Sequence, residues 1–304
     1  MDIYMPIAEM SVNVLLIFAV GGGVGFLSGL FGVGGGFLMT PLLFFIGIPS
    51  AVAVATGAPL IVASSISGVL AHWKRGNVDF RMGGFLLVGG VVGSTLGVWV
   101  FTLLRGEGHI DLVIRISYVF FLAVIGGLML TESVRAIMQR KKNQSKRDHS
   151  HNWMHGLPFK VRFRTSRLYI SALPPLGVGL FVGFLAGIMG VGGGFVMVPA
   201  MIYLLGMPTS VVVGTSLFQI IFVSANVTIL QSATNQTVDI VLALILLFGG
   251  VMGAQFGAKA GAKMQGEQLR GMLALIVLGV CVKLTYDLVL TPSELFTITE
   301  IARY

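Results

Sequence analysis

Charged residues are scarce in this sequence. Asp, Glu, Lys and Arg make up 11% of its 304 residues, whereas apolar residues make up 55%. A soluble domain needs about a quarter of its residues charged to cover its surface. Most apolar residues fall in long runs, at 11–30, 36–71, 83–104, 112–131, 176–206, 209–230, 238–258 and 271–290. Because about 20 apolar residues cross a bilayer as a helix, and no barrel-like alternation is present, we expect an all-α, polytopic helical membrane protein.

Cysteine is nearly absent too. The single Cys281 excludes a disulfide within the chain and any cysteine-based zinc or iron–sulfur site. Three of the histidines, His149, His151 and His155, lie in a polar segment that is typical of a solvated linker. The apolar runs contain no carboxylate pair or histidine cluster that could form a catalytic site. We therefore expect no cofactor, no metal site and no enzymatic activity.

The chain contains one unit twice. Residues 25–41, GFLSGLFGVGGGFLMTP, align without a gap with residues 183–199, GFLAGIMGVGGGFVMVP. Further pairs follow in the same order: Thr56 with Thr215, Val78-Asp79 with Val238-Asp239, and Gly89-Gly90 with Gly249-Gly250. An ordered series of this kind indicates duplication. The expected organisation is a membrane repeat at 1–137, a basic cytoplasmic loop at 138–170 and a second membrane repeat at 171–304.

The segment between the two repeats carries most of the chain's excess positive charge. Residues 138–168 hold nine Lys or Arg and one Asp, a net charge of +8 that equals the net charge of the whole chain. A basic segment can bind nucleic acid, but between membrane spans the positive-inside rule favours a cytoplasmic loop, and we expect no nucleic-acid partner. The lipid bilayer is the expected environment, and anionic headgroups are a second partner for the loop.

Two topologies are open. If the short segments 36–47 and 194–206 cross the membrane, each repeat has five segments and the repeats are inverted relative to each other. If these segments are re-entrant, each repeat has four spans and the repeats are parallel. Inversion places Lys259, Lys263 and Arg270 on the same side as the basic loop, whereas the parallel arrangement places them on the opposite side, so the charge distribution favours inversion. Segments of about a dozen residues seldom span alone, which argues for the alternative.

The matched glycine clusters, 32–36 and 190–194, are the most informative feature. Consecutive glycines cost a helix about 1 kcal/mol each relative to alanine, and the freed backbone groups need partners in a bilayer. One interpretation is close helix packing. The other is a discontinuous helix whose N-terminus and free amides bind an anion near the midplane. We favour the second, which makes the following glycines candidate ligands: Gly34, Gly35, Gly36, Gly192, Gly193 and Gly194.

Side chains near the breaks complete the candidate site. Hydroxyls at this depth can donate to an oxyanion or satisfy a carbonyl of their own helix. The candidates are Thr40, Thr56, Thr215, Ser216 and Asn226, with Ser64, Ser65, Gln219 and Ser224 as weaker ones. Asp79 and Asp239 have the pattern of helix N-caps. The pair Lys283 and Asp287, one turn apart near a span end, indicates an ordinary i,i+4 ion pair.

These motifs resemble the TauE/SafE family of sulfite and sulfonate transporters. The similarity is carried by residues 29–37 with Pro41, and by residues 187–199 with Gly214-Thr215-Ser216. The resemblance implies a secondary transporter of a small sulfur-containing anion (sulfite, sulfoacetate or another organosulfonate) in a bacterial inner (plasma) membrane. It leaves open the coupling ion, proton or sodium, and a homo-oligomeric state. An anion channel, or a transporter of another small organic anion, is the alternative.

Overall fold

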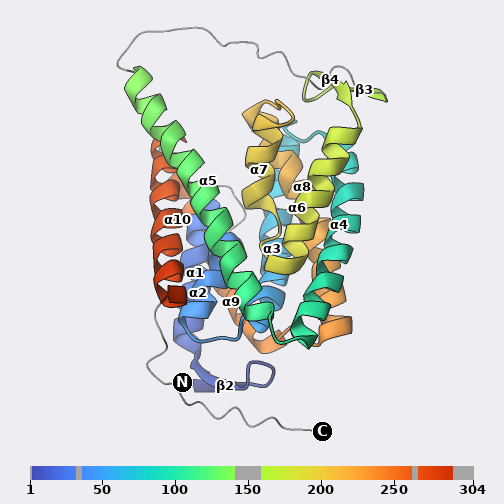
Figure 1. The fold of residues 1–304 in the computed structure, drawn as a ribbon. Coiled ribbons are helices and arrows are strands. Elements are labelled where there is room, and N and C mark those ends of the chain that lie inside the picture. The colour runs from blue at the N-terminus through green and yellow to red at the C-terminus, as the bar shows by residue number, and fades with distance from the viewer. Residues whose placement is uncertain (1, 32–35, 141–158, 262–265, 290–304) are drawn as a thin grey trace.

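The computed structural model describes all residues except 1, 32–35, 141–158, 262–265 and 290–304. It is mostly helical (Figure 1), and this confirms the expected class of polytopic helical membrane protein. The first half contains β1 (Asp2–Met5), β2 (Met10–Asn13), α1 (Val14–Phe31), α2 (Gly36–Phe45), α3 (Ser50–Lys74), α4 (Phe80–Gly106) and α5 (Ile110–Arg140). The second half contains β3 (Lys160–Phe163), β4 (Leu168–Ser171), α6 (Leu173–Met189), α7 (Gly194–Tyr203), α8 (Thr209–Leu230), a π-helical turn η2 (Gln231–Asn235), α9 (Ile240–Gly261) and α10 (Gly266–Val289).

Within the described residues, each half has three helices long enough and apolar enough to cross a bilayer. The six apolar stretches are Ser50–Lys74, Phe80–Gly106, Ile110–Thr131, Val211–Asn235, Ile240–Gly257 and Gly271–Val289. At about 1.5 Å per residue, a helix needs about 20 residues to cross 30 Å of hydrocarbon. The helices α2 and α7 have 10 residues each and reach only about half of that distance.

The helices α6 and α7 form a hairpin that enters and leaves at the same end of the molecule. The helix α6 begins directly after β4, and the end of α7 packs on the same β-hairpin, because Met201 and Leu205 share a buried apolar cluster with Phe163 and Ile170. Figure 1 shows α7 running back beside α6 toward β3 and β4. A single crossing by α7, which the five-segment topology assumed, does not occur.

Glycines hold the outer helices together. The helix α1 packs along α9, and α4 packs along α6 (Figure 1). A methyl group at Gly93 would collide with the carbonyl of Leu180, and one at Gly253 would collide with the carbonyl of Gly22. Close backbone approach through small residues is the usual way in which membrane helices associate. Gly84, on the same helix as Gly93, has no described atom within 4 Å of an added Cβ, so it makes no such close contact among the described residues.

The two β-hairpins were not predicted. The hairpin of β3 and β4 lies in the segment that the sequence analysis assigned to a basic loop, and it buries Phe163 completely. The hairpin of β1 and β2 lies at the opposite end of the molecule (Figure 1) and buries Met5. Both hairpins therefore belong to the packed structure, one at each end.

Candidate functional site

The second glycine break is a tight turn between two helices. The helix α6 ends at Met189, and the next helix begins at Gly194. Gly190, Gly192 and Gly193 have φ angles of 68°, 69° and 78°. These values lie in the left-handed region, which glycine adopts without the steric penalty of a side chain. The turn leaves the N-terminus of α7 free of a preceding helix, so its first amide groups have no partner within their own helix.

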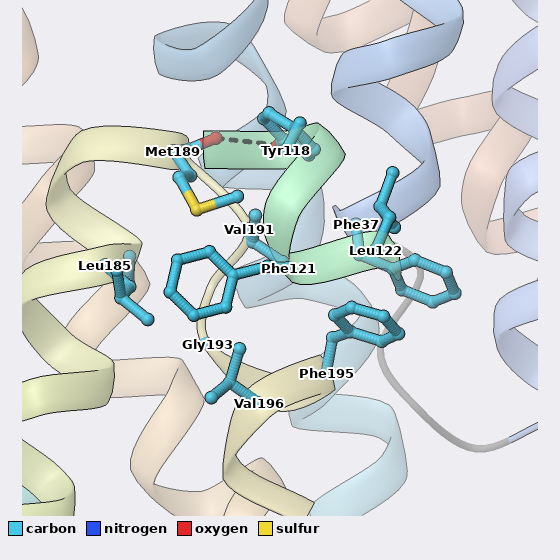
Figure 2. A pocket seen from close by; sticks show the side chains of 11 residues that line it. Phe37, Tyr118, Phe121, Leu122, Leu185, Met189, Val191, Gly193, Phe195 and Val196 are labelled. Atoms are coloured by element: carbon cyan, nitrogen blue, oxygen red, sulfur yellow. Dashed lines mark hydrogen bonds between the residues drawn. The ribbon is translucent and has the colours of Figure 1, made fainter. Parts of the chain in front are cut away.

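The N-terminus of α2 meets this break. Gly34 and Gly35 lie outside the described residues, and Gly36 is the first residue of α2. A methyl group at Gly36 would lie 3.0 Å from the carbonyl oxygen of Val191. One residue further, Phe37 stacks on Phe195 with 4.5 Å between ring centroids and an interplanar angle of 10° (Figure 2). The helix N-termini of α2 and α7 are therefore neighbours near the centre of the molecule.

Two serines lie on the helices that flank this centre. A methyl group at Gly192 would lie 2.9 Å from Oγ of Ser224 and 2.7 Å from a side-chain carbon of Ile61. Ser224 on α8 is fully buried, and its hydroxyl oxygen has no hydrogen-bond partner among the described residues. Ser65 on α3 is buried and unpartnered in the same way. A buried hydroxyl without a partner is uncommon, because desolvation costs about 1–3 kcal/mol when no hydrogen bond replaces water.

A small apolar cavity lies on the other side of the second glycine break. It has a volume of about 10 Å³ and is lined by Phe121, Leu185, Phe195 and their neighbours (Figure 2). That volume is at the lower limit for a single water molecule. The Tyr118 hydroxyl donates to the Met189 carbonyl over 2.8 Å and so satisfies the end of α6. The polar groups of the break therefore lie toward α3 and α8, away from this cavity.

Thr56 and Thr215 hold the ends of other helices. The Thr215 hydroxyl accepts from the Asp79 amide over 3.0 Å, and the Thr56 hydroxyl accepts from the Asp239 amide over 3.1 Å. Both threonines are fully buried. Their matched positions thus reflect a matched structural contact, and their role as ligands stays a prediction.

The two aspartates cap helices, as the sequence predicted, and they also bind the hairpins. One carboxylate oxygen of Asp79 accepts from the Met82 amide, and the other accepts from the amide and the hydroxyl of Ser166, over 3.0 and 2.7 Å. We call this set, with Thr215, the Asp79 clamp. It joins the first half to the hairpin of the second half.

The Asp239 clamp has the same design at the opposite end. One carboxylate oxygen of Asp239 accepts from the Leu242 amide over 3.0 Å, and the other accepts from the Ile7 amide over 3.1 Å. With Thr56, it joins the second half to the hairpin of the first half. The sequence could place the caps but not the hairpin donors, since these lie 87 and 232 residues away.

The remaining candidates have varied surroundings. Thr40 is fully buried in α2, with its hydroxyl 3.7 Å from the place of a methyl group on Gly57. Ser216 donates to the Val213 carbonyl of its own helix over 3.0 Å. Asn226 donates to Ser94 and Thr95 of α4, over 2.9 and 3.1 Å. None of these contacts tests a role in substrate binding.

Ser65, Gln219 and Ser224, three of the four weaker candidates, are buried and have side-chain atoms without a hydrogen-bond partner among the described residues, as is the main candidate Thr40. The fourth, Ser64, donates to the Ile61 carbonyl of its own helix over 3.1 Å. Ser65 follows Thr56 by nine residues, and Ser224 follows Thr215 by nine, so the repeat itself relates the two serines. The Lys283–Asp287 pair is exposed, with 3.4 Å between its charged atoms, as predicted for an ordinary ion pair.

The comparisons agree with an integral, multi-pass membrane protein of transport type. A family profile described as "Sulfite exporter TauE/SafE" matches residues 17–284. The chain belongs to the TauE/SafE family.

Curated relatives cover nearly the same length. The "Probable membrane transporter protein YjnA" of Bacillus subtilis is 29% identical over 272 residues, which is 88% of this chain and 97% of that protein. The "Probable membrane transporter protein" of Xylella fastidiosa (strain 9a5c) is 27% identical over 274 residues, 89% of this chain and 94% of that protein. The "Probable membrane transporter protein MJ0441" of Methanocaldococcus jannaschii is 28% identical over 277 residues, 86% of this chain and 91% of that protein. No solved structure matches the chain.

Proposed function

We propose that the protein is a secondary transporter of a small sulfur-containing anion, such as sulfite, sulfoacetate or another organosulfonate. The anion binds at the centre, between the N-termini of α2 and α7. The observation that carries this proposal is the meeting of two helix N-termini beside the buried, unpartnered hydroxyl of Ser224. The family's printed description, which names sulfite export, supports the choice of anion.

The electrostatics of the centre suit a ligand that must leave again. Each helix N-terminus carries the equivalent of about half a positive charge, so two of them attract an anion without a fixed cation. Neutral donors bind an oxyanion less tightly than a lysine or arginine would, and weak binding favours release on the far side. Ser224, and its repeat counterpart Ser65, add hydroxyl donors at the same depth of the bundle.

The two halves act as inverted repeats around this centre, because a hairpin of two short helices that returns to its own end leaves three crossing helices among the described residues of each half, an odd number. The packing supports the proposal, since α1 lies on α9 as α6 lies on α4, and the two hairpins lie at opposite ends. Exposed basic residues gather at the end that carries β3 and β4, and this end faces the cytoplasm of a bacterial inner membrane. They are Lys74, Arg75, Arg81, Lys160, Arg162, Arg164 and Arg167.

The central test compares two buried serines on α8. Ser224→Ala removes the unpartnered hydroxyl at the break, whereas Ser216→Ala removes a hydroxyl that already binds its own helix. We expect sulfite or sulfoacetate affinity, measured by calorimetry on purified protein, to fall about tenfold in Ser224→Ala, which corresponds to one hydrogen bond of about 1.4 kcal/mol. Ser216→Ala should stay within about twofold of the unaltered protein. Equal anion affinity in both variants would exclude the second glycine break as the binding site.

Flux in proteoliposomes separates the alternatives. A transporter shows saturable uptake and counterflow of preloaded anion, and an imposed proton or sodium gradient identifies its coupling ion. Flux that rises linearly with concentration, and that no gradient drives uphill, would identify an anion channel instead. Saturable uptake of a carboxylate, with none of sulfite or sulfoacetate, would identify the transporter of another organic anion.

A further inference from the structure

The two halves differ along one helix contact. The helix α8 packs on α4, and its counterpart α3 packs on α9. At the level of Gly90 on α4, the facing residue of α8 is Gln219, and a methyl group on Gly90 would lie 2.5 Å from the amide nitrogen of that glutamine. At the matched level of Gly250 on α9, the facing residue of α3 is Leu60, and a methyl group there would lie 2.5 Å from a Leu60 methyl carbon. The same position is thus an amide in one contact and a hydrocarbon in the other.

The amide of Gln219 has no described partner. The side chain is fully buried, and neither its nitrogen nor its oxygen forms a hydrogen bond within the described residues. Water is scarce in the interior of a membrane protein, so an unpaired primary amide is costly there. Leu60 shows that the fold accommodates an apolar residue at the equivalent place. Gln219 therefore indicates a ligand or water that arrives in another state of the protein.

Polar groups continue along the same contact on both sides of Ser224. Asn226 lies two residues beyond Ser224 and binds Ser94 of α4 over 2.9 Å. Further along, the hydroxyl of Thr102 donates to the amide oxygen of Asn235 over 3.1 Å. The repeat counterpart of Ser94 is Ala254 on α9. We call this polar contact between α4 and α8 the polar seam, and the apolar contact between α3 and α9 the apolar seam.

From these observations we infer that the polar seam is the route by which a hydrated anion reaches the central site, and that the amide of Gln219 is a contact on that route. This inference rests on the proposed function, and it gives the two halves different roles in that function. The two helix N-termini bind the anion from both halves, whereas only the seam between α4 and α8 opens to water. The amide suits this task, because its nitrogen donates to an oxyanion and its oxygen accepts from the water that accompanies it. The apolar seam stays closed in both states.

Cysteine labelling tests the route without depending on transport. In a Cys281→Ser background, Ser94→Cys and Ala254→Cys place one thiol on each seam at matched positions. The thiolate is the reactive form, and it does not form without water. A charged, water-soluble maleimide should therefore modify Ser94→Cys at least tenfold faster than Ala254→Cys in purified, full-length protein. Solvent exposure in the described structure alone would predict faster labelling of Ala254→Cys, since Ser94 is fully buried and Ala254 is half-buried. Equal rates, or faster labelling of Ala254→Cys, would overturn the route.

A pair of glycine variants tests the contact with Gln219. Gly90→Ala pushes the Gln219 amide and a methyl group of Val223 aside, whereas Gly250→Ala pushes Leu60 aside, so the melting temperature of each variant is measured beside its flux to separate strain from loss of the contact. Initial sulfoacetate flux in proteoliposomes should fall at least fivefold in Gly90→Ala and less than twofold in Gly250→Ala. Equal losses would exclude Gln219 as a contact. Gln219→Leu, which copies the mirror position, should reproduce the Gly90→Ala loss with a normal melting temperature.

Failure of the proposed function has a different signature. If the unaltered protein carries neither sulfite nor sulfoacetate, the labelling rates still decide whether the polar seam is hydrated. If flux is normal and the two cysteines label equally, the transporter stands and the route is wrong.

Discussion

The two halves are alike at the hydrogen bonds that join them and unlike along the helix contact that we propose as the solute route. The Asp79 and Asp239 clamps use the same residue types in the same roles, at opposite ends. The contacts of α4 with α8 and of α3 with α9 share their glycines but differ in polarity. Duplication supplies two copies of a scaffold, and the route proposed above places the specialisation for the solute on α8 of the second half. The following experiments test that division, from the largest expected effect to the smallest.

The largest effect should come from the glycines that let helices touch. Gly93→Ala and Gly253→Ala both drive a methyl group into a backbone carbonyl of the neighbouring helix. Because a backbone cannot move aside as a side chain can, we expect each to lower the stability by about 3 kcal/mol or to prevent accumulation of folded protein. Melting temperature in detergent measures the effect, with Gly84→Ala as the unaffected control. A large loss in one variant alone would break the equivalence of the halves.

The next largest loss of stability is expected from the two aspartate clamps. Asp79→Ala removes the acceptor for three donors and Asp239→Ala for two, and the orphaned buried amides cost about 2–3 kcal/mol in total. Asp79→Asn keeps one carbonyl acceptor, so it should lose less. Thermal unfolding of each variant gives the comparison, and the exposed Asp287→Ala serves as the control, with a change below about 0.5 kcal/mol. Unchanged melting of Asp79→Ala would show that the clamp is not needed for stability.

Smaller losses are expected for the threonines of the clamps. Thr56→Val and Thr215→Val each remove one acceptor from a buried amide, which costs about 1 kcal/mol. If these residues only hold helix ends, anion affinity stays within about twofold while the melting temperature falls. A tenfold loss of affinity without a loss of stability would restore both as ligands.

The smallest effect is expected in the basic segment outside the described residues. Replacing residues 143–158 with Gly and Ser should leave flux and melting temperature unchanged, because the hairpin from Lys160 onward is preserved. Extending the replacement through residue 166, with Gly at 166, should destabilise the protein, since it removes the buried ring of Phe163 and the hydroxyl that Ser166 donates to Asp79. Complete loss of flux in the shorter replacement, with correct insertion, would assign the segment a function.

Much of the scaffold could be predicted from the sequence because it depends on local signals. The length of the apolar runs was enough to predict the membrane-spanning helices. An aspartate just before an apolar run was enough to predict both helix caps. The return of α7 could not be predicted, since a ten-residue apolar segment fits a re-entrant helix and half of a crossing equally well. Which glycine of a span packs, Gly93 or Gly84, depends on the partner helix and not on the span itself.

The contacts of the candidate residues could be predicted from the sequence only in small part, and their role in binding stays a prediction. Pattern matching favoured Thr56 and Thr215 because both repeats contain them, but a residue conserved by duplication can equally serve the scaffold that both repeats share. Gln219 was one of the weaker candidates, and its counterpart in the first half is Leu60. Its burial without a partner is a property of the packed bundle, which no periodicity reveals.

The crossed attachment of the hairpins has a consequence for how the chain is made. When the first half leaves the ribosome, Asp79 already caps α4, but the donors of Ser166 do not yet exist. The amide of Ile7 remains without its acceptor for longer, because Asp239 is synthesised more than two hundred residues later. Neither half can complete its own clamp, so a half produced alone carries a buried acceptor without its partner. Synthesis of the second half is thus the step that completes the buried hydrogen bonds of the first.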